Sequence, residues 1–274
     1  PTTTQETSRV KISPLAKAIA KEKGLEITTL QGSGEDGRIV KRDLENVSKS
    51  AVNYTVAAVS GEESFTEIRV SQMRKTIARR LSESVQNAPH FYLSMDVNMD
   101  IAVALRSELN AVLPEKVSFN DIVLKAVAFA LRQNPQVNTS WLGDTIRQYN
   151  HIHIGMAVAV EEGLVVPVIK FADQKSISQI SAEAKQLAQK ASSKKIVPAD
   201  MEGSTFTVSN LGMFGISAFT AIINEPNACI LAVGAIRQIP VVKDGKIEAG
   251  NVLTLTLSSD HRVVDGAVGS KFLQ

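Results

Sequence analysis

A break in the sequence pattern at residues 47–64 most constrains how this chain can fold. The segment VSKSAVNYTVAAVSGEES is rich in Ala, Val and Ser and has neither helical nor strand periodicity, which is typical of a flexible tether. It separates a short, charged segment at residues 9–46 from a long periodic segment at residues 65–274. The pattern therefore predicts two folding units, preceded by a Thr-rich stretch at residues 1–8 that resembles the end of a linker.

The composition excludes several classes of protein. Hydrophobic residues make up 44% and charged residues 21% of the 274 positions, as in ordinary globular domains. The formal net charge is only +2, which argues against a nucleic-acid-binding protein. The sequence contains no uncharged apolar run long enough to span a membrane. Cys229 is the only cysteine, so neither a disulfide framework nor a Cys-based zinc site is expected, and a reducing compartment is indicated.

Residues 9–46 predict two short helices around a glycine-rich loop. Pro14 suits the start of the first helix and Gly24 its end, and the second helix is expected near residues 40–45. A unit of about 38 residues should have only marginal stability. The loop matches the dinucleotide-binding fingerprint at its three glycines, but the acidic residues between them would repel a phosphate. A tight loop is the preferred interpretation of Gly32, Gly34 and Gly37.

Residues 65–274 predict a mixed α/β (α+β) domain. Expected strands are Glu67–Val70, FYLSMDVNM, the pair HIHIGMAVAV and LVVPVIK, STFTVSN, ACILAVGAI, PVVKDGKI with an Asp-Gly turn, and VLTLTLSS. Expected helices are the segment containing Met73, Ile77, Leu81 and Val85, then IAVALRSELNAV, a segment from Ser118 or Asn120 to Leu131, and residues 176–193. AVGSKFLQ resembles the start of a helix. The absence of strict βαβ alternation favours a large mixed sheet.

His261 is the strongest candidate for a catalytic residue. It follows the apolar strand VLTLTLSS directly, within SSDHRVVDG, so it is expected at the rim of the sheet. A free imidazole titrates near neutral pH and can accept a proton from a thiol. Asp265, four positions later, could orient the base or anchor the loop through an ion pair, and Gly266 permits a turn. A Ser-His-Asp hydrolase is not favoured, because no G-x-S-x-G motif is present.

Other reactive residues favour structural interpretations. His151 and His153 alternate in HIHIG and should face one way, but no third metal ligand is near them in the sequence, so no metal site is predicted. Cys229 lies in the apolar run ACILAV and should be a buried, inert thiol. The basic residues at positions 74–80 are expected on a solvated helix face.

The sequence also resembles a known family along nearly its whole length. Residues 65–274 resemble the catalytic domain of dihydrolipoamide acyltransferases, the core component of 2-oxo acid dehydrogenase complexes. The matching segments are RKTIARRL, PHFYL, FNDIVLKA, HIGMAVAV, GLVVPVI, GSTFTVSNLGMFG, INEPNACILAVG and SSDHRVVDGA. Chloramphenicol acetyltransferase shares the fold and the His-x-x-x-Asp-Gly signature but not the whole series. Residues 9–46 resemble the peripheral-subunit-binding domain of the same enzymes.

The resemblance implies an activity and roles for three residues. The expected reaction is reversible acetyl transfer between a dihydrolipoyl thiol and coenzyme A, without a metal. His261 would be the general base, Ser209 would donate a hydrogen bond to the oxyanion, and Asp265 would hold the loop and the geometry of His261 rather than exchange protons. Arg106 would contact a phosphate of coenzyme A. GSTFTVSNLGMFG is closest to the acetyl-transferring, pyruvate dehydrogenase type; branched-chain and succinyl types remain alternatives, as does a stand-alone O-acetyltransferase of the chloramphenicol type.

The resemblance also implies partners. A homotrimer within a 24-mer or 60-mer core is expected, with Ser209 and His261 pairing within or between chains. Lys17, Lys21 and Arg38 would dock the dehydrogenase-decarboxylase or lipoamide dehydrogenase components. The lipoyl group would be carried by a domain not found in this sequence, so residues 1–8 are expected to be a linker remnant, and the final helix of the family is expected to continue past Gln274. The location would be the bacterial cytoplasm or the mitochondrial matrix, with the cytoplasm favoured.

Overall fold

The computed structural model describes residues 10–45, 47, 61–161 and 163–274. The chain divides between Glu67 and Ile68 into two compact units, which are considered separately. Most of the predicted tether at residues 47–64, and all of the predicted linker remnant at residues 1–8, lie outside the described residues.

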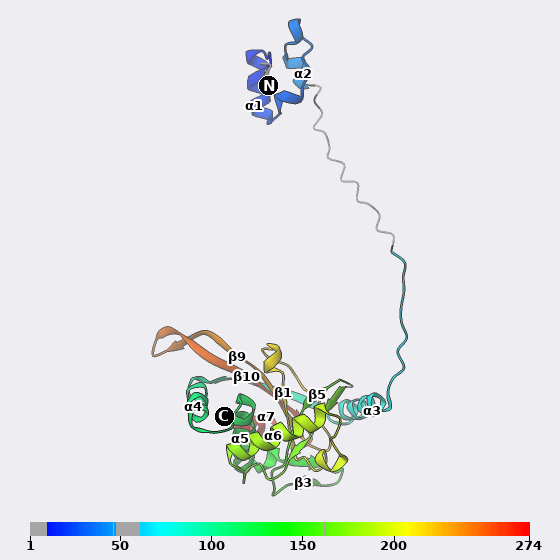
Figure 1. Ribbon diagram of the computed structural model, residues 1–274, viewed down its shortest axis with the longest axis vertical. Coiled ribbons are helices and arrows are strands. Elements are labelled where there is room, and N and C mark those ends of the chain that lie inside the picture. The colour runs from blue at the N-terminus through cyan, green and yellow to red at the C-terminus, as the bar shows by residue number, and fades with distance from the viewer. Residues whose placement is uncertain (1–9, 46, 48–60, 162) are drawn as a thin grey trace, which may run out of the picture. The chain divides into compact units, whose positions relative to one another are not determined.

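The small unit contains the two predicted helices, α1 (Pro14–Lys23) and α2 (Lys41–Glu45), with short 3₁₀ turns η1 (Ile27–Thr29) and η2 (Glu35–Gly37) between them (Figure 1). The hydroxyl of Ser13 caps α1, and Gly24 ends it in the left-handed conformation at φ 62°. The core of this unit consists of four buried side chains, those of Ala16, Ala20, Ile39 and Leu44. So small a core has little stability to spare.

The glycine-rich loop folds onto its own backbone. A Cβ atom on Gly32 would lie 2.4 Å from the backbone carbonyl carbon of Arg38, so no larger residue fits there. Gly37 has a φ of 72°, which favours glycine. The carboxylate of Asp43 accepts hydrogen bonds from the backbone N–H groups of Ser33 (3.0 Å) and Val40 (2.9 Å). The tight-loop interpretation is therefore confirmed.

The large unit is built on one mixed sheet of six strands, in the order β1-β10-β9-β8-β4-β7. The pairs β1–β10, β10–β9 and β4–β7 are antiparallel, whereas β9–β8 and β8–β4 are parallel. The strand bounds are β1 (His90–Asn98), β4 (Ile154–Met156), β7 (Val168–Ile169), β8 (Phe206–Asn210), β9 (Cys229–Lys243) and β10 (Lys246–Asp260). The predicted Asp-Gly turn joins β9 to β10, with positive φ at Asp244 and Gly245. The predicted mixed α/β class is confirmed.

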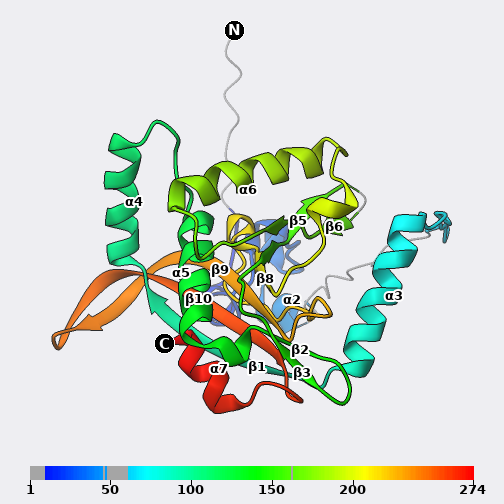
Figure 2. The same cartoon turned by 90° about the horizontal axis from the view of Figure 1, so that it is seen from below.

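Helices α5, α6 and α7 pack over the sheet and form the main core with it (Figure 2). Their apolar side chains meet those of the central strands, and the ring centroids of Phe206 in β8 and Phe272 in α7 are 5.3 Å apart. The helix bounds are α3 (Gln72–Asn87), α4 (Asp100–Val112), α5 (Phe119–Gln133), α6 (Ile177–Ser192) and α7 (Gly266–Leu273). Two short hairpins, β2 (Thr139–Trp141) with β3 (Ile146–Gln148) and β5 (Val158–Val160) with β6 (Gly163–Val165), and the 3₁₀ turns η3 (Pro135–Val137), η4 (Pro198–Asp200) and η5 (Gly212–Phe214) complete the unit.

One predicted strand is wrong. Residues 67–70 form no strand, and the side chains of Phe65 and Ile68 are 89% and 85% exposed. Residue type favours a strand here, but a strand needs a neighbour to accept and donate ladder hydrogen bonds, and residues 61–71 have none among the described residues. Among all the residues that the structure describes, no helix is long and apolar enough to cross a membrane.

Candidate active site

The end of β10 presents the imidazole of His261. The strand ends at Asp260, and the next residue donates its backbone N–H to the carbonyl oxygen of Pro89, at 3.0 Å. The ring packs against Phe91, with centroids 4.3 Å apart, and the side chain is exposed. The sequence thus correctly placed His261 at the rim of the sheet, anchored by its backbone and open at its ring.

The turn that follows is closed by its own polar groups. The carbonyl oxygen of Asp260 accepts from the N–H groups of Val263 and Val264, both at 3.0 Å. The buried carboxylate of Asp260 receives the guanidinium of Arg262 as a fork, with Nη2 to Oδ2 at 2.7 Å and Nε to Oδ1 at 3.0 Å. This hydrogen-bonded pairing raises the pKa of Arg262. His261 therefore projects from a turn that is held by two backbone hydrogen bonds and one ion pair.

Asp265 caps helix α7. Its Oδ1 accepts a hydrogen bond from the backbone N–H of Val268, at 2.9 Å, and its backbone has the extended conformation of an N-cap residue. The ion pair that the sequence suggested is not found among the described residues. Asp265 anchors the loop through the helix cap instead, and no hydrogen bond joins its carboxylate to His261 in this part of the chain.

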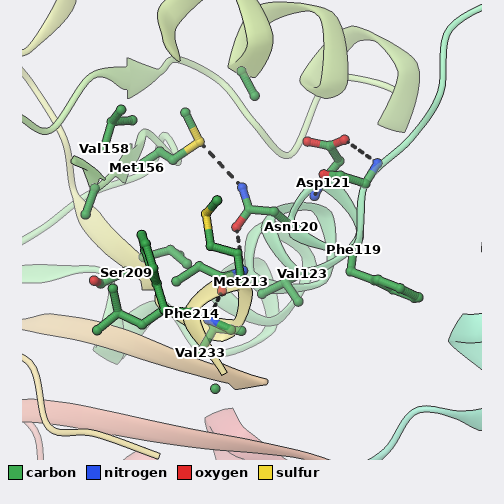
Figure 3. Close-up of a pocket in the computed structure, with 18 of the residues that line it drawn as sticks. Phe119, Asn120, Asp121, Val123, Met156, Val158, Ser209, Met213, Phe214 and Val233 are labelled. Carbon is green, nitrogen blue, oxygen red and sulfur yellow. Dashed lines mark hydrogen bonds between the residues drawn. The ribbon is translucent and has the colours of Figure 1, made fainter. Parts of the chain in front are cut away.

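Ser209 lies in a separate pocket of about 780 Å³ (Figure 3). The residue belongs to β8, and its side chain is half-buried among mostly apolar neighbours, including Met156, Val158, Val233 and Phe214. Its hydroxyl has no hydrogen-bond partner among the described residues. A hydroxyl in an apolar pocket of this size is free to donate to a bound substrate.

Two asparagines fix the backbone beside Ser209. Asn210 accepts from the N–H of Gly212 at 2.8 Å and donates to Oδ1 of Asn120 at 3.1 Å (Figure 3). Asn120 stands in the first turn of α5, which begins with a capping box between Ser118 and Asp121. The end of β8 is thereby tied to the start of α5 across the pocket.

Ser209 and His261 are far apart within the chain. Ser209 is level with Ala232 of β9, which is level with Thr256 of β10, and His261 follows five positions later. At about 3.3 Å per residue along the strand and about 4.8 Å per strand across the sheet, their Cα atoms are roughly 19 Å apart. The two predicted catalytic groups therefore do not form one site in a single chain.

Arg106 lies beside the pocket rather than in it. Its Nε donates to the carbonyl oxygen of Val117 at 3.0 Å, and its guanidinium lies over the ring of Phe119 at 4.5 Å. Phe119 lines the pocket. The structure thus gives Arg106 a packing role against a residue of the pocket lining.

The three predicted docking residues of the small unit are exposed. Lys17 and Lys21 lie on α1, and Arg38 follows η2. None of the three forms an ion pair within the described residues, whereas neighbouring cations do, as in Lys11–Asp36 at 3.6 Å. Their charges are available to a partner.

The remaining candidates are structural. His151 and His153 precede β4 rather than lie in a strand, but their rings are 4.2 Å apart. Nδ1 of His153 bonds to the carbonyl oxygen of Gly203 at 3.1 Å. Among the described residues no group of three or more potential metal ligands exists. Burial lowers the pKa of His153, with His151 adding to the effect. Cys229 is fully buried, and burial raises its pKa to about 12, as expected of an inert thiol.

The sequence interpretation missed two features of these sites. The Asp260–Arg262 pair was signalled by a charged residue at the end of the apolar run VLTLTLSS, where an unpaired carboxylate would be costly. The Asn120–Asn210 pair had no local signal, because its members are 90 positions apart.

Comparison with known proteins gives both units a family. Residues 62–274 match the family described as 2-oxoacid dehydrogenases acyltransferase (catalytic domain), and residues 10–45 match the e3 binding domain. The chain is 44% identical over 272 residues to the dihydrolipoyllysine-residue acetyltransferase component of the pyruvate dehydrogenase complex of Rickettsia conorii. The aligned residues cover 98% of this chain but only 66% of that protein.

Solved structures agree with this match. A probable dihydrolipoamide acetyltransferase from Listeria monocytogenes is 40% identical, with a TM-score of 0.74 over 77% of this chain and 92% of that chain. The dihydrolipoamide acetyltransferase of Azotobacter vinelandii is 37% identical, with a TM-score of 0.74 over 77% of this chain and 88% of that chain; its structure was studied for the role of a serine, a histidine and an asparagine in the catalytic mechanism. The chain belongs to the family of 2-oxoacid dehydrogenase acyltransferases.

Proposed function

We propose that this chain transfers an acetyl group between a dihydrolipoyl thiol and coenzyme A, within the core of a pyruvate dehydrogenase complex. The observation that carries the proposal is the exposed imidazole of His261 on a turn held by backbone hydrogen bonds and by the Asp260–Arg262 ion pair. The serine and histidine named for the Azotobacter enzyme are 52 positions apart, and its asparagine follows four positions after the histidine. Ser209, His261 and Asp265 have the same spacing, with an aspartate in the third place.

His261 would act as the general base. It takes the proton from the thiol of coenzyme A, whose pKa should resemble that of cysteine, at about 8.5. The thiolate attacks the carbonyl carbon of the acetyl-lipoyl thioester, and the tetrahedral intermediate then releases the lipoyl sulfur. The protonated imidazole returns its proton to that sulfur, so His261 ends the cycle neutral.

Ser209 would stabilise the negative oxygen of the tetrahedral intermediate. Its hydroxyl donates to that oxygen, and one donor of this kind lowers a barrier by roughly 3–4 kcal/mol. The apolar lining of the pocket, including Met156 and Val233, keeps water from the thioester, for which hydrolysis competes with transfer. Arg106, which lies over the ring of the pocket residue Phe119, would contact a phosphate of coenzyme A at the pocket margin.

A complete site would need two chains. Since Ser209 and His261 lie at separate places in one chain, the proposal requires the histidine of one copy to face the pocket of the next, as in a homotrimer. Assembly of such trimers into a 24-mer or 60-mer core, and a location in the cytoplasm of a bacterium, stay predictions. Lys17, Lys21 and Arg38 of the small unit would dock the lipoamide dehydrogenase or dehydrogenase-decarboxylase components.

The activity is tested by transfer of the acetyl group of acetyl-coenzyme A to dihydrolipoamide, measured alongside succinyl- and isobutyryl-coenzyme A. We expect acetyl transfer to be fastest, and His261→Ala to reduce kcat at least ~100-fold with the assembly intact. His153→Ala is the matched control, since that imidazole is held by Gly203 away from the pocket. A His261→Ala protein that retains wild-type turnover would refute the assignment.

The sharing of the site is tested by mixing two impaired variants. Ser209→Ala and His261→Ala chains are unfolded together and refolded at equal amounts. If histidine and serine come from adjacent chains, about a quarter of the sites in a random trimer contain both groups and activity returns to that fraction. If both groups act within one chain, no mixed assembly contains an intact site and activity stays at the level of the separate variants.

Docking is tested by its dependence on salt. Exposed cations that meet an acidic partner should bind more weakly as ionic strength rises. We expect Lys17→Gln and Lys21→Gln to weaken binding of lipoamide dehydrogenase and to reduce its salt dependence. Lys11→Gln is the control, since that ammonium already pairs with Asp36. Binding that is unchanged between 50 mM and 500 mM salt would contradict the electrostatic mechanism.

A further inference from the structure

The residues on either side of His261 form a single ion pair. The carboxylate of Asp260 is 4% exposed and holds the guanidinium of Arg262 through three contacts between 2.7 and 3.1 Å, while Oδ1 also accepts the backbone N–H of Arg262 at 3.0 Å. The side chains and the intervening backbone thus close a ring that contains the backbone of His261. A two-point fork fixes orientation as well as distance.

The pair is itself held in place. Asp260 is the last residue of β10, level with His90 of β1, and its N–H donates to the carbonyl oxygen of Ala228 at 2.8 Å. The guanidinium of Arg262 lies 5.2 Å from the centre of the Trp141 ring in β2. Three strands therefore determine where the pair sits, and the pair determines the backbone from which His261 projects.

We infer that Asp260 and Arg262 are positioning residues for His261, which fix its backbone and neutralise the charges adjacent to it. This inference rests on the proposed role of His261. The carboxylate alone would be a buried negative charge next to the imidazole, and the guanidinium alone would be a neighbouring positive charge. Joined, they leave the imidazole beside a pair with no net charge.

The other charged or titratable groups near this turn are few among the described residues. The carboxylate of Asp265 is engaged by the start of α7, and Glu225 acts on Arg262. The imidazole of His90 lies between the carbonyl oxygen of Ala88 and the N–H of Ile223. None of these groups would replace the charge of a missing partner in the ion pair.

Three variants of the assembled protein separate orientation from charge. Arg262→Lys keeps the positive charge but loses the fork, so we expect kcat to fall about 10-fold with KM within about 2-fold and the pH midpoint of kcat/KM unchanged. Arg262→Gln leaves the Asp260 charge and should raise that midpoint by about one pH unit. Asp260→Asn leaves the cation and should lower it by a similar amount.

A second readout does not require turnover. The rate at which diethyl pyrocarbonate modifies His261, followed by mass spectrometry of its peptide, reports protonation of the imidazole at each pH. Its midpoint should move with that of kcat/KM in the same directions, and the double variant Asp260→Asn with Arg262→Gln should restore it. Arg132→Gln is the matched control, because Arg132, on α5, also forms an ion pair with a largely buried carboxylate, that of Asp173.

The outcomes distinguish this inference from the proposed function. If the wild type transfers no acetyl group, the proposed function fails, and the modification midpoints alone then decide the inference. If the wild type is active, the inference is overturned by an Arg262→Lys protein with wild-type kcat. It is also overturned if Arg262→Gln and Asp260→Asn leave the pH midpoints of kcat/KM and of modification in place. If Arg262→Gln or Asp260→Asn does not assemble, the size of the loss of kcat in Arg262→Lys decides whether the inference holds.

Discussion

Replacing Asp265 distinguishes a helix cap from a catalytic orienting group. The carboxylate accepts the N–H of Val268 at 2.9 Å at the start of α7, an eight-residue helix whose Phe272 packs into the core against Phe206. Asp265→Ala removes this cap, which typically costs about 1 kcal/mol of stability. In a unit of about 200 residues, that loss lowers Tm by about 2–4 °C.

Asp265→Asn should behave differently, because an amide oxygen caps a helix about as well as a carboxylate. We expect its Tm to match the wild type and its kcat to stay within about 3-fold. An aspartate that orients a catalytic histidine gives another result, since its replacement by asparagine costs about 10⁴-fold in kcat in the serine proteases. Differential scanning fluorimetry and the acetyl-transfer assay measure the two effects.

The refuting result is an Asp265→Asn protein that melts normally but loses activity by orders of magnitude. That outcome would mean that the carboxylate reaches the imidazole in the working assembly and that the cap is secondary. Conversely, a fall in Tm for Asp265→Ala with only a small loss of kcat would establish that Asp265 acts through α7.

Three further predictions follow from local environments. Cys229 should not react with a disulfide reagent such as DTNB near neutral pH until the protein unfolds, since it is fully buried with a pKa of about 12; rapid reaction in the native state would contradict this. The lowered pKa of His153 means that the unfolded chain binds the proton more tightly than the folded chain. The contribution of the neutral imidazole to the free energy of unfolding should therefore be fully present above pH 6.5 and be lost as the pH falls below it. His153→Gln should flatten this part of the dependence of the free energy of unfolding on pH, as measured by urea titrations. Gly32→Ala should unfold the small unit, because its Cβ would lie 2.4 Å from the Arg38 backbone, and circular dichroism of the isolated segment should show the loss of helix; retained helix would show that the loop can shift.

Much of the local structure could be predicted because its signals are local. Pro14 and Gly24 mark the ends of α1, and the Asp-Gly dipeptide marks the turn between β9 and β10. The position of His261 followed from the apolar strand before it. Each of these depends on conformational preferences of a few adjacent residues, which a sequence displays directly.

One failure depends on long-range pairing. Residues 67–70 have the residue types of a strand, but no partner strand lies beside them in the described part of the chain. The cap role of Asp265 was a different kind of miss: an aspartate directly before a helix is itself a local N-cap signal, and it was available in the sequence. The residue pattern instead indicated a group that orients the base or anchors the loop through an ion pair.

The topology of the sheet explains why the two candidate catalytic groups cannot meet in one chain. Ser209 lies near the carboxyl end of β8, and His261 follows the carboxyl end of β10. β8 is parallel to β9, and β9 is antiparallel to β10, so β8 and β10 run in opposite directions. Their carboxyl ends therefore lie at opposite ends of the strands of the sheet. No change of side-chain rotamer spans that separation, because both strands are hydrogen-bonded within the core. A reaction that uses both groups therefore requires a second copy of this unit, placed so that the end of β10 that carries His261 in one copy meets the end of β8 that carries Ser209 in the other.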